Sequence, residues 1–314
     1  MNHLIVIAGA TATGKSELAL ELASELGAAI VNADSMQIYK GMDIGTAKLA
    51  PSERRGIPHY LLDVVDVKQD VTVSWYQEQA RKIIDELLPK QSVVIVGGTG
   101  LYIKAVLDDL NFPETDEAVR SELEKLAEKI GVDALHERLA KLDPAAALAI
   151  PKENVRRVIR ALEVIEITGK PFTANLPRAG STKYPNAKQY GLELDRDLLD
   201  EKISRRVDLM WEQGFVGEVK NLIEQGLLEG KTAKQAIGYS QIINFLDGQT
   251  SEADAIELTK IATRQYARRQ ETWFKRDERI TWLTSLSERK VSVINDILKA
   301  WLPPTDMEPR TTSF

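Results

Sequence analysis

The sequence contains no cysteine, and this absence removes several kinds of chemistry at once. Disulfides, thiolate metal sites and a cysteine nucleophile are all excluded. No window approaches the roughly 18 to 20 apolar residues that cross a bilayer, and the apolar run at residues 3–10 is too short for a signal peptide. Because a chain without disulfides fits a reducing compartment, we expect a soluble cytoplasmic protein with no membrane partner.

Basic residues are outnumbered by acidic ones over the chain as a whole. The 41 lysines and arginines stand against 47 aspartates and glutamates, which gives a formal net charge of -6. Hydrophobic residues make up 43% of the 314 residues, an ordinary composition for a globular protein with a large core. A protein that binds nucleic acid through its overall field would be basic, so any nucleic-acid surface here has to be a local patch.

Short apolar runs alternate with helical patterns in the first third of the chain, and helices dominate afterwards. The expected strands lie at residues 3–10, 28–34, 59–66, 92–98, 189–195 and 280–283. The expected helices lie at residues 15–26, 75–88, 115–131, 133–143, 154–169, 197–213, 215–227 and 251–274. Apolar strands that alternate with helices are typical of a parallel sheet covered on both faces.

We therefore predict an α/β fold of the P-loop NTPase-like class, a parallel sheet flanked by helices with an inserted small all-helical subdomain. Residues 1–120 and 186–302 are expected to form the α/β core and its C-terminal helices. Residues 121–185 are expected to form the helical insertion, and residues 303–314 a disordered tail. Ligands of such sheets bind beyond the C-terminal ends of the strands.

The segment GATATGKS, at residues 9–16, fits the pattern G-x-x-x-x-G-K-[ST] at every fixed position. It lies between an expected strand and an expected helix, as the motif requires. The loop amides and the helix N-terminus offer positive potential to a phosphate, Lys15 adds a mobile charge, and the Ser16 hydroxyl suits Mg²⁺. The predicted phosphate-binding residues are Gly9, Ala10, Thr11, Ala12, Thr13, Gly14, Lys15 and Ser16.

The loop does not say which phosphate it holds. A nucleoside triphosphatase normally carries an acidic residue at the end of a second apolar strand, where it helps to hold Mg²⁺. The strand at residues 92–98 runs instead into GGTGLY, and no N-K-x-D tetrapeptide for reading guanine is present. Asp63 and Asp66 follow another apolar run. The pattern is therefore compatible with a diphosphate other than that of ATP.

Asp34 stands where the expected strand at residues 28–34 ends, at the edge of the sheet where ligands collect. A carboxylate beside a bound phosphate cannot attract that anion, because like charges repel. It is better suited to coordinate Mg²⁺ or to accept a proton from an attacking group. A capping or turn aspartate is the alternative interpretation.

Two segments carry local positive charge on helical faces, opposite their apolar stripes. The residues of the first are Lys260, Arg264, Arg268, Arg269, Lys275 and Arg276, and those of the second are Arg156, Arg157 and Arg160. A basic helical face is most often simply solvated. Two of them together, one beside the aromatic-containing ETWFK, predict a surface that reads nucleic-acid phosphates.

Five stretches of the chain resemble, in order, the motifs of the tRNA dimethylallyltransferases. They are GATATGKS, NADSMQIYKGMDIGTAK, VGGTGLYIKA, NVRRVIRALEV and YARRQETWFKR, and the resemblance extends from about residue 4 to residue 283. The second stretch is the most specific of them. The resemblance implies a magnesium-dependent prenyltransferase that transfers the dimethylallyl group of dimethylallyl diphosphate to the N6 amine of adenine 37, beside the anticodon of tRNA.

The resemblance also assigns roles to individual residues. Asp34 matches the general base of the family, and Thr99 matches the residue at the channel between the two substrates, although a capping threonine is an alternative. Lys15, Arg206 and Ser16 with Mg²⁺ would stabilise the departing diphosphate, with Arg206 preferred to its neighbour Arg205. The implied tRNA contacts, besides the segment 234–239, are Asp34, Ser35, Met36, Gln37, Thr99, Arg120, Arg156, Arg157, Arg160, Arg268, Arg269 and Lys275.

Other functions stay open at this level. The similar adenylate isopentenyltransferases prenylate free AMP or ADP, and a P-loop kinase of small molecules or a tRNA-binding ATPase switch shares the phosphate loop. The helical insertion and the two basic segments favour a macromolecular acceptor. The chain lacks the cysteine-bearing zinc finger of many eukaryotic members, so it resembles the short bacterial form, and we expect a monomer.

Overall fold

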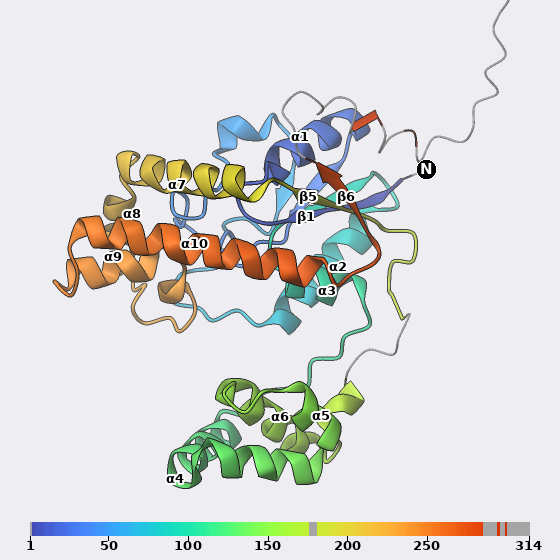
Figure 1. Ribbon diagram of the computed structural model, residues 1–314. Helices are drawn as coiled ribbons and strands as arrows, with labels where there is room; N and C mark the ends of the chain where they lie inside the picture. The colour runs from blue at the N-terminus through green and yellow to red at the C-terminus, as the bar shows by residue number, and fades with distance from the viewer. Residues whose placement is uncertain (1, 176–180, 285–293, 296–298, 300–314) are drawn as a thin grey trace, which may run out of the picture. The chain divides into compact units, whose positions relative to one another are not determined.

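The computed structural model describes residues 2–175 and 181–284, together with residues 294, 295 and 299 (Figure 1). The predicted disordered tail at residues 303–314 lies outside the described residues. The chain divides into two compact units, Met1–Ile103 with Tyr184–Phe314 and Lys104–Lys183. No helix in the described part of the chain combines the length and apolar character needed to cross a membrane.

The first unit contains a six-stranded parallel sheet in the order β3-β2-β4-β1-β5-β6, which confirms the predicted α/β class. The strands are β1 (Leu4–Gly9), β2 (Ala29–Asn32), β3 (His59–Tyr60), β4 (Val93–Val96), β5 (Lys188–Glu193) and β6 (Ile280–Thr284). Every residue of β1 is buried, as expected for a central strand covered on both faces. The strand order brings the ends of β1, β2 and β4 together at one edge.

Six helices and two short turns complete the described part of this unit, and α1, α2 and α10 contact the sheet. They are α1 (Lys15–Leu26), α2 (Val73–Leu87), α7 (Arg196–Glu212), α8 (Phe215–Glu224), α9 (Tyr239–Leu246) and α10 (Glu252–Phe274), with short 3₁₀ turns η1 (Pro51–Arg54) and η3 (Ala233–Gln235). The helix α3 (Gly100–Leu107) contains the boundary between the units. The long α10 runs beside α7 and contacts α9 (Figure 1).

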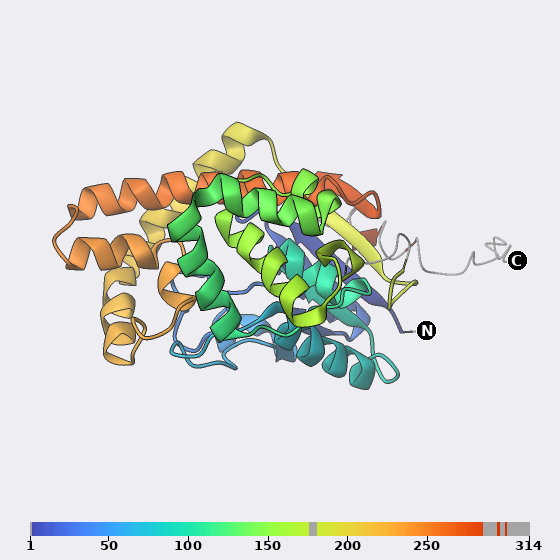
Figure 2. The same cartoon turned by 90° about the horizontal axis from the view of Figure 1, so that it is seen from below.

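The second unit is all-helical and has its own apolar core. It contains α4 (Glu117–Leu142), α5 (Pro144–Ala149), α6 (Val155–Thr168) and the turn η2 (Phe172–Asn175). Gly131, with φ 79° and ψ 167°, breaks α4 into two segments that lie beside α6 (Figure 2). The break falls at the end of the first of the two helices that the sequence predicted there, because a residue at that φ leaves the helical conformation.

Two boundaries differ from the sequence prediction by more than three residues. The expected strand at residues 59–66 ends at Tyr60, because Leu61 and Asp63 adopt φ values of 60° and 55° that no extended strand permits. The helical unit begins at Lys104, before the expected residue 121. The segment ahead of α4 belongs to it because Arg160 donates hydrogen bonds to the carbonyls of Pro113 and Glu114.

Candidate active site

The phosphate loop joins β1 to α1 and is closed by its own side chains. Gly14, with φ 92°, turns the chain into α1. The buried Thr13 hydroxyl donates to the Ala10 carbonyl at 2.9 Å, and Lys15 Nζ donates to the same carbonyl at 2.5 Å. The N-terminal turn of α1 thus presents its positive end and a lysine to one small volume, the arrangement that binds phosphate groups.

Two cations converge on this loop. Arg206, from α7, donates to the Thr11 hydroxyl at 3.3 Å, whereas the neighbouring Arg205 is exposed. Burial and the nearby Arg206 lower the pKa of Lys15 to about 7, against the opposite influence of Asp34. Burial also lowers the pKa of Arg206, again opposed by Asp34. Two cations brought this close together, one of which lowers the pKa of the other, favour the binding of an anion beside them.

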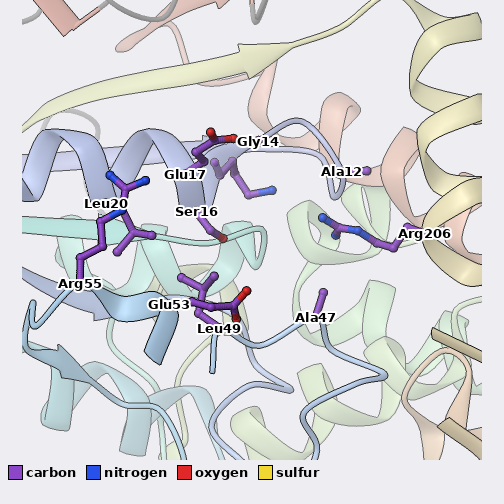
Figure 3. A pocket seen from close by; sticks show the side chains of 11 residues that line it. Ala12, Gly14, Ser16, Glu17, Leu20, Ala47, Leu49, Glu53, Arg55 and Arg206 are labelled. Atoms are coloured by element: carbon purple, nitrogen blue, oxygen red, sulfur yellow. The ribbon is translucent and has the colours of Figure 1, made fainter. Parts of the chain in front are cut away.

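A pocket of about 400 Å³ opens beside the phosphate loop (Figure 3). Lys15 and Ser16 line it, and Figure 3 shows Arg206 reaching into it from α7 below the loop residue Ala12. Arg55 and Glu53, from the segment around η1, lie on the opposite side. The structure therefore brings together the phosphate-loop residues and the arginine predicted to face the diphosphate.

Asp34 lies directly after β2 and begins a turn. Its Oδ1 accepts the amides of Met36 at 2.9 Å and Gln37 at 3.4 Å, so the aspartate does cap a turn. Asn32 fixes it from both sides, since the Asn32 amide group bonds the Asp34 carbonyl and amide at 3.0 Å each. Within the described residues the other carboxylate oxygen, Oδ2, accepts no hydrogen bond. Capping and proton transfer are thus compatible, because they use different oxygens.

Thr99 joins the end of β4 to the turn of Asp34. Its amide donates to the Ala33 carbonyl at 3.1 Å, and its hydroxyl accepts the Ser35 amide at 3.0 Å. Tyr266, on α10, lies close to Thr99, and burial raises the pKa of its hydroxyl to about 12. The Thr99 hydroxyl thus bonds the turn that Asp34 begins and not an amide in the first turn of α3, so Thr99 stands beside Asp34.

Gln270, on the buried face of α10, bridges the phosphate loop and the strand end that carries Thr99. Its Oε1 accepts the Thr11 amide at 2.9 Å, and its Nε2 donates to the Gly98 carbonyl at 2.8 Å. A Cβ on Gly98 would lie 2.1 Å from Gln270 Nε2, so only glycine admits this approach. The sequence analysis missed Gln270. Its signal was a glutamine three residues from Ala267 and four from Phe274, on the apolar stripe of a helix.

A second cavity, of about 320 Å³, adjoins these groups. Its polar lining includes Asp34, Arg206, Tyr266 and Arg269. Its apolar lining consists of Met36, Val207, Met210, Phe215, Ala236, Ile237 and Tyr239. A carboxylate, a buried guanidinium and an apolar wall thus share one cavity next to a phosphate loop, which suits a substrate with a charged head and a hydrocarbon tail.

The geometry can now be set against known proteins. A family model described as IPP transferase matches residues 37–277, more than half of the chain. The chain belongs to the IPP transferase family. Among its relatives, a protein from Thermobifida fusca named tRNA dimethylallyltransferase is 55% identical over 289 residues, 90% of each chain. Another of that name, from Nocardioides sp., is 50% identical and covers 93% of this chain and 95% of its own.

Solved structures of this family share the fold. A tRNA isopentenylpyrophosphate transferase from Bacillus halodurans is 38% identical, with a TM-score of 0.69 over 95% of this chain and 96% of the other. A eukaryotic dimethylallyltransferase described as acting on tRNA is 27% identical, with a TM-score of 0.81 over 98% of this chain and 82% of the other. The resemblance that the sequence motifs carried is confirmed at the level of family and fold.

The basic stripe of α10 in this IPP transferase faces a neighbouring helix. Lys260 Nζ pairs with Asp208 at 2.8 Å, Arg264 donates to the Ser204 hydroxyl at 2.6 Å, and Arg268 pairs with Asp200 at 3.4 Å. These partners lie four residues apart on α7, so the two helices form a matched ladder. The interpretation of the whole stripe as a phosphate-reading face was wrong, because two of its members, Lys260 and Arg264, are committed to α7. The exposed Arg268, Arg269 and Lys275 stay candidates for tRNA contact.

The arginines of the helical unit also divide into two kinds. Arg120 and Arg160 pair at 2.7 Å and 3.0 Å with Glu163, which is 0% exposed. Burial alone would raise the pKa of Glu163, but hydrogen bonds from both arginines hold it below its ordinary value. Arg156 and Arg157 are exposed on the first turn of α6. Arg120 and Arg160 therefore stabilise this unit whether or not they also contact a nucleic acid.

Metal binding has to be assessed from the donor groups present. Among the described residues, no group of three or more histidines, cysteines, aspartates or glutamates is arranged to hold a metal ion. Mg²⁺ needs few protein ligands when phosphate oxygens and water complete its octahedron. Ser16 lines the pocket at the phosphate loop, and its hydroxyl could supply one such ligand. The residues present therefore fit a magnesium ion that is bound together with a diphosphate.

Proposed function

We propose that this chain is a tRNA dimethylallyltransferase, which transfers the dimethylallyl group of dimethylallyl diphosphate to the N6 amine of adenine 37 in tRNA. One observation carries the proposal. Arg206 lines two adjoining spaces, the pocket at the phosphate loop that Lys15 also lines and the apolar-walled cavity that Asp34 lines. The names of the relatives support tRNA as the acceptor.

The proposed reaction breaks one bond and forms another. The adenine N6 lone pair attacks the allylic carbon and forms a C–N bond, while the C–O bond to diphosphate breaks and its electron pair leaves with the diphosphate. The amine proton passes to Oδ2 of Asp34, whose Oδ1 stays bound to the turn amides. General-base assistance of this kind is worth ~10²–10⁴-fold in rate.

The leaving group collects the negative charge that develops in this reaction. Lys15, Arg206 and the amides of residues 9–16 lie where that charge would be stabilised. A bound magnesium ion would add Lewis-acid stabilisation of the diphosphate oxygens, and Ser16 is the residue that would hold it. Arg206 bonds Thr11 in the same loop, so its guanidinium is already oriented before a substrate arrives.

Thr99 and the turn of Ser35, Met36 and Gln37 would orient the adenine. An adenine stacked in a tRNA loop has to be extruded to reach Asp34 inside its cavity, and the unstacking energy has to come from contacts elsewhere. Exposed cations suited to that role are Arg156 and Arg157 in the helical unit, and Arg268, Arg269 and Lys275 at the end of α10. We further propose that the protein works as a cytoplasmic monomer.

The alternative acceptors are less well supported. A free AMP or ADP acceptor needs no extended cationic surface, and the relatives named above are tRNA enzymes. A kinase of small molecules would need a phosphoryl acceptor near the loop, whereas the cavity wall here is largely apolar. Neither a kinase nor a switch ATPase explains Asp34 beside an apolar wall.

Nucleoside analysis of tRNA tests the proposal directly. Unmodified tRNA is incubated with the protein, Mg²⁺ and dimethylallyl diphosphate, then digested and separated. We expect N6-dimethylallyladenosine from position 37, and a tRNA with guanine at position 37 serves as the control. Label that appears in added AMP and not in tRNA would overturn the choice of acceptor.

A further inference from the structure

A carboxylate from a distant helix holds the loop that follows Met42. Oε2 of Glu218, in α8, accepts the amides of Asp43 at 3.0 Å and Ile44 at 2.6 Å, and Oε1 accepts the amide of Gly45 at 3.2 Å. The Tyr239 hydroxyl, at the start of α9, donates to the same Oε1 at 2.6 Å. Successive backbone amides that converge on one anion form a nest, and the anion fixes the backbone that makes it.

Aromatic packing closes the same loop from the other side. A Cβ on Gly45 would lie 2.2 Å from Phe215 Cε2 and 2.6 Å from Tyr239 Cε2, so the loop backbone presses directly on both rings. The two rings pack edge to face at a centroid distance of 4.9 Å, and both are fully buried. Glu218 lies one helical turn from Phe215 on α8. A single short stretch of α8 thus supplies both the carboxylate and the ring that define the loop.

The loop held by Glu218 is part of the wall of the cavity at Asp34. Gly45 and Thr46 line that cavity, whereas Glu218 is not among its lining residues. The Thr46 carbonyl accepts Gln37 Nε2 at 2.9 Å, and the Gln37 amide bonds Asp34 Oδ1 at 3.4 Å. Hydrogen bonds joined by the backbone of Gly45 and Thr46 and by the side chain of Gln37 therefore connect Glu218 to the carboxylate of Asp34.

Within the part of the chain that the structure describes, Glu218 forms no ion pair. Three backbone amides and the Tyr239 hydroxyl, all of them hydrogen-bond donors, stabilise its carboxylate. Charge-assisted hydrogen bonds are roughly twice as strong as neutral ones. Burial and the neighbouring Glu218 keep the pKa of Tyr239 well above its ordinary value, so its hydroxyl remains a donor. A glutamine at this position would place its NH₂ group against at least one of the amides or the hydroxyl that Glu218 now accepts.

We propose that Glu218 is a positioning residue for prenyl transfer, which sets the cavity wall at residues 43–46 and, through Gln37, the turn of Asp34. This inference rests on the proposed function, because it assigns that cavity to the prenyl donor. Glu218 touches neither substrate. Its removal should therefore loosen the fit of the donor and leave the tRNA-binding surfaces intact.

The test compares Glu218→Gln with Glu224→Gln, a matched control at an exposed glutamate of the same helix. We expect the KM for dimethylallyl diphosphate at saturating tRNA to rise ~10-fold in Glu218→Gln, the scale of a lost charge-assisted hydrogen bond. The kcat should change less, the Kd for tRNA should stay the same, and Glu224→Gln should match the parent protein. Tyr239→Phe removes one donor only and should raise the same KM ~2- to 3-fold.

A purely stabilising role for Glu218 predicts a different pattern. It would lower Tm and the active fraction in Glu218→Gln while the KM for the donor stays at the parent value, and that outcome would overturn the inference. Hydrogen exchange supplies a readout without catalysis, since amides 43–45 should exchange faster in Glu218→Gln than in Glu224→Gln. Unchanged exchange would also overturn it. A parent protein that fails to prenylate tRNA counts against the proposed function alone, and the exchange measurement still decides whether Glu218 holds the loop.

Discussion

The two loops that meet at the site are held in different ways. The phosphate loop at residues 9–16 is closed largely by itself, through Thr13 and Lys15, which both bond the Ala10 carbonyl. The segment from Asp34 to Thr46 has local hydrogen bonds too, such as that from Gln37 to the Thr46 carbonyl, but three of its successive amides bond Glu218, which lies far away in the sequence. A local motif therefore suffices to recognise the first loop, whereas the geometry of the second depends on the whole fold of its unit.

The largest effect should come from the chemistry at the start of the second loop. Asp34→Asn keeps an oxygen that can accept the Met36 amide but removes the proton acceptor. We expect turnover to fall by ~10²-fold or more, consistent with the loss of a general base, while tRNA binding is retained. Single-turnover transfer assays and tRNA titrations measure the two quantities. Asp66→Asn, at an exposed turn aspartate, is the control, and near-normal turnover in Asp34→Asn would exclude the base.

Breaking the bridge that Gln270 forms between the phosphate loop and the end of β4 should lower activity less than the loss of Asp34. Gln270→Ala removes the partner of both the Thr11 amide and the Gly98 carbonyl, so the phosphate loop loses its register with Thr99. Two lost buried hydrogen bonds predict a fall in kcat/KM of roughly 10- to 100-fold. Gly98→Ala, which drives a methyl group into Gln270, should give a similar loss. Steady-state kinetics measure kcat/KM for both variants, and Gln249→Ala, at an exposed glutamine, is the control. Equal kcat/KM in Gln270→Ala, Gly98→Ala and Gln249→Ala would show that the bridge has no part in the mechanism.

The phosphate loop should respond to pH in a way that the second loop does not. Burial lowers the pKa of Lys15 to about 7 in the free protein, so its charge is present below that pH and is lost as the pH rises through it. Donor affinity should therefore fall roughly tenfold between about pH 7 and about pH 9. The Lys15→Arg variant, whose side chain stays charged, is the control. The ionisation of dimethylallyl diphosphate affects the parent protein and the variant equally, so a difference between their pH profiles reports on Lys15. A profile for Lys15→Arg that parallels the parent would assign the dependence to another group.

The smallest effects should fall on the exposed cations. Replacing Arg268 and Arg269 by alanine should weaken tRNA binding several-fold and lower the slope of log Kd against log salt by about 1 to 2. Lys260→Ala breaks a pair with Asp208 on α7 and should change thermal stability by under ~1 kcal/mol with no change in that slope. Filter binding across a salt series and thermal denaturation separate the two sites. An equal change in the salt slope of Lys260→Ala and of the Arg268 and Arg269 variant would show that Lys260 also contacts tRNA.

Much of the fold and part of the site followed from local patterns. The boundaries of α1 at Lys15 and Leu26 agree with the prediction because Gly14 and Gly27 both adopt positive φ at its ends. Asp34 was found because a carboxylate at a strand end is conspicuous. The preference for Arg206 over Arg205 came from the family resemblance, and the structure places Arg206 in the site.

The rest could not be predicted from local patterns, because it depends on partners distant in sequence. Lys260, Arg264 and Arg268 have the spacing of a basic surface. Only the position of α7 shows that Lys260 and Arg264 are partly buried and bonded to the neighbouring helix. The early end of β3 depends on the backbone at Leu61, which no propensity indicates. Gln270 and Glu218 act through hydrogen bonds across more than 170 residues of sequence. Side chains of this kind become functional only when the sheet and helices are assembled.

The ladder between α7 and α10 also fixes how the two helices are aligned. Asp200 faces Arg268, Ser204 faces Arg264 and Asp208 faces Lys260, so one partner number rises as the other falls, and the helices run antiparallel. Arg268 is the exposed rung of the ladder, so its pair with Asp200 presents its guanidinium at the surface in a set direction. A nucleic acid that contacts Arg268 would thus meet a side chain that α7 already orients.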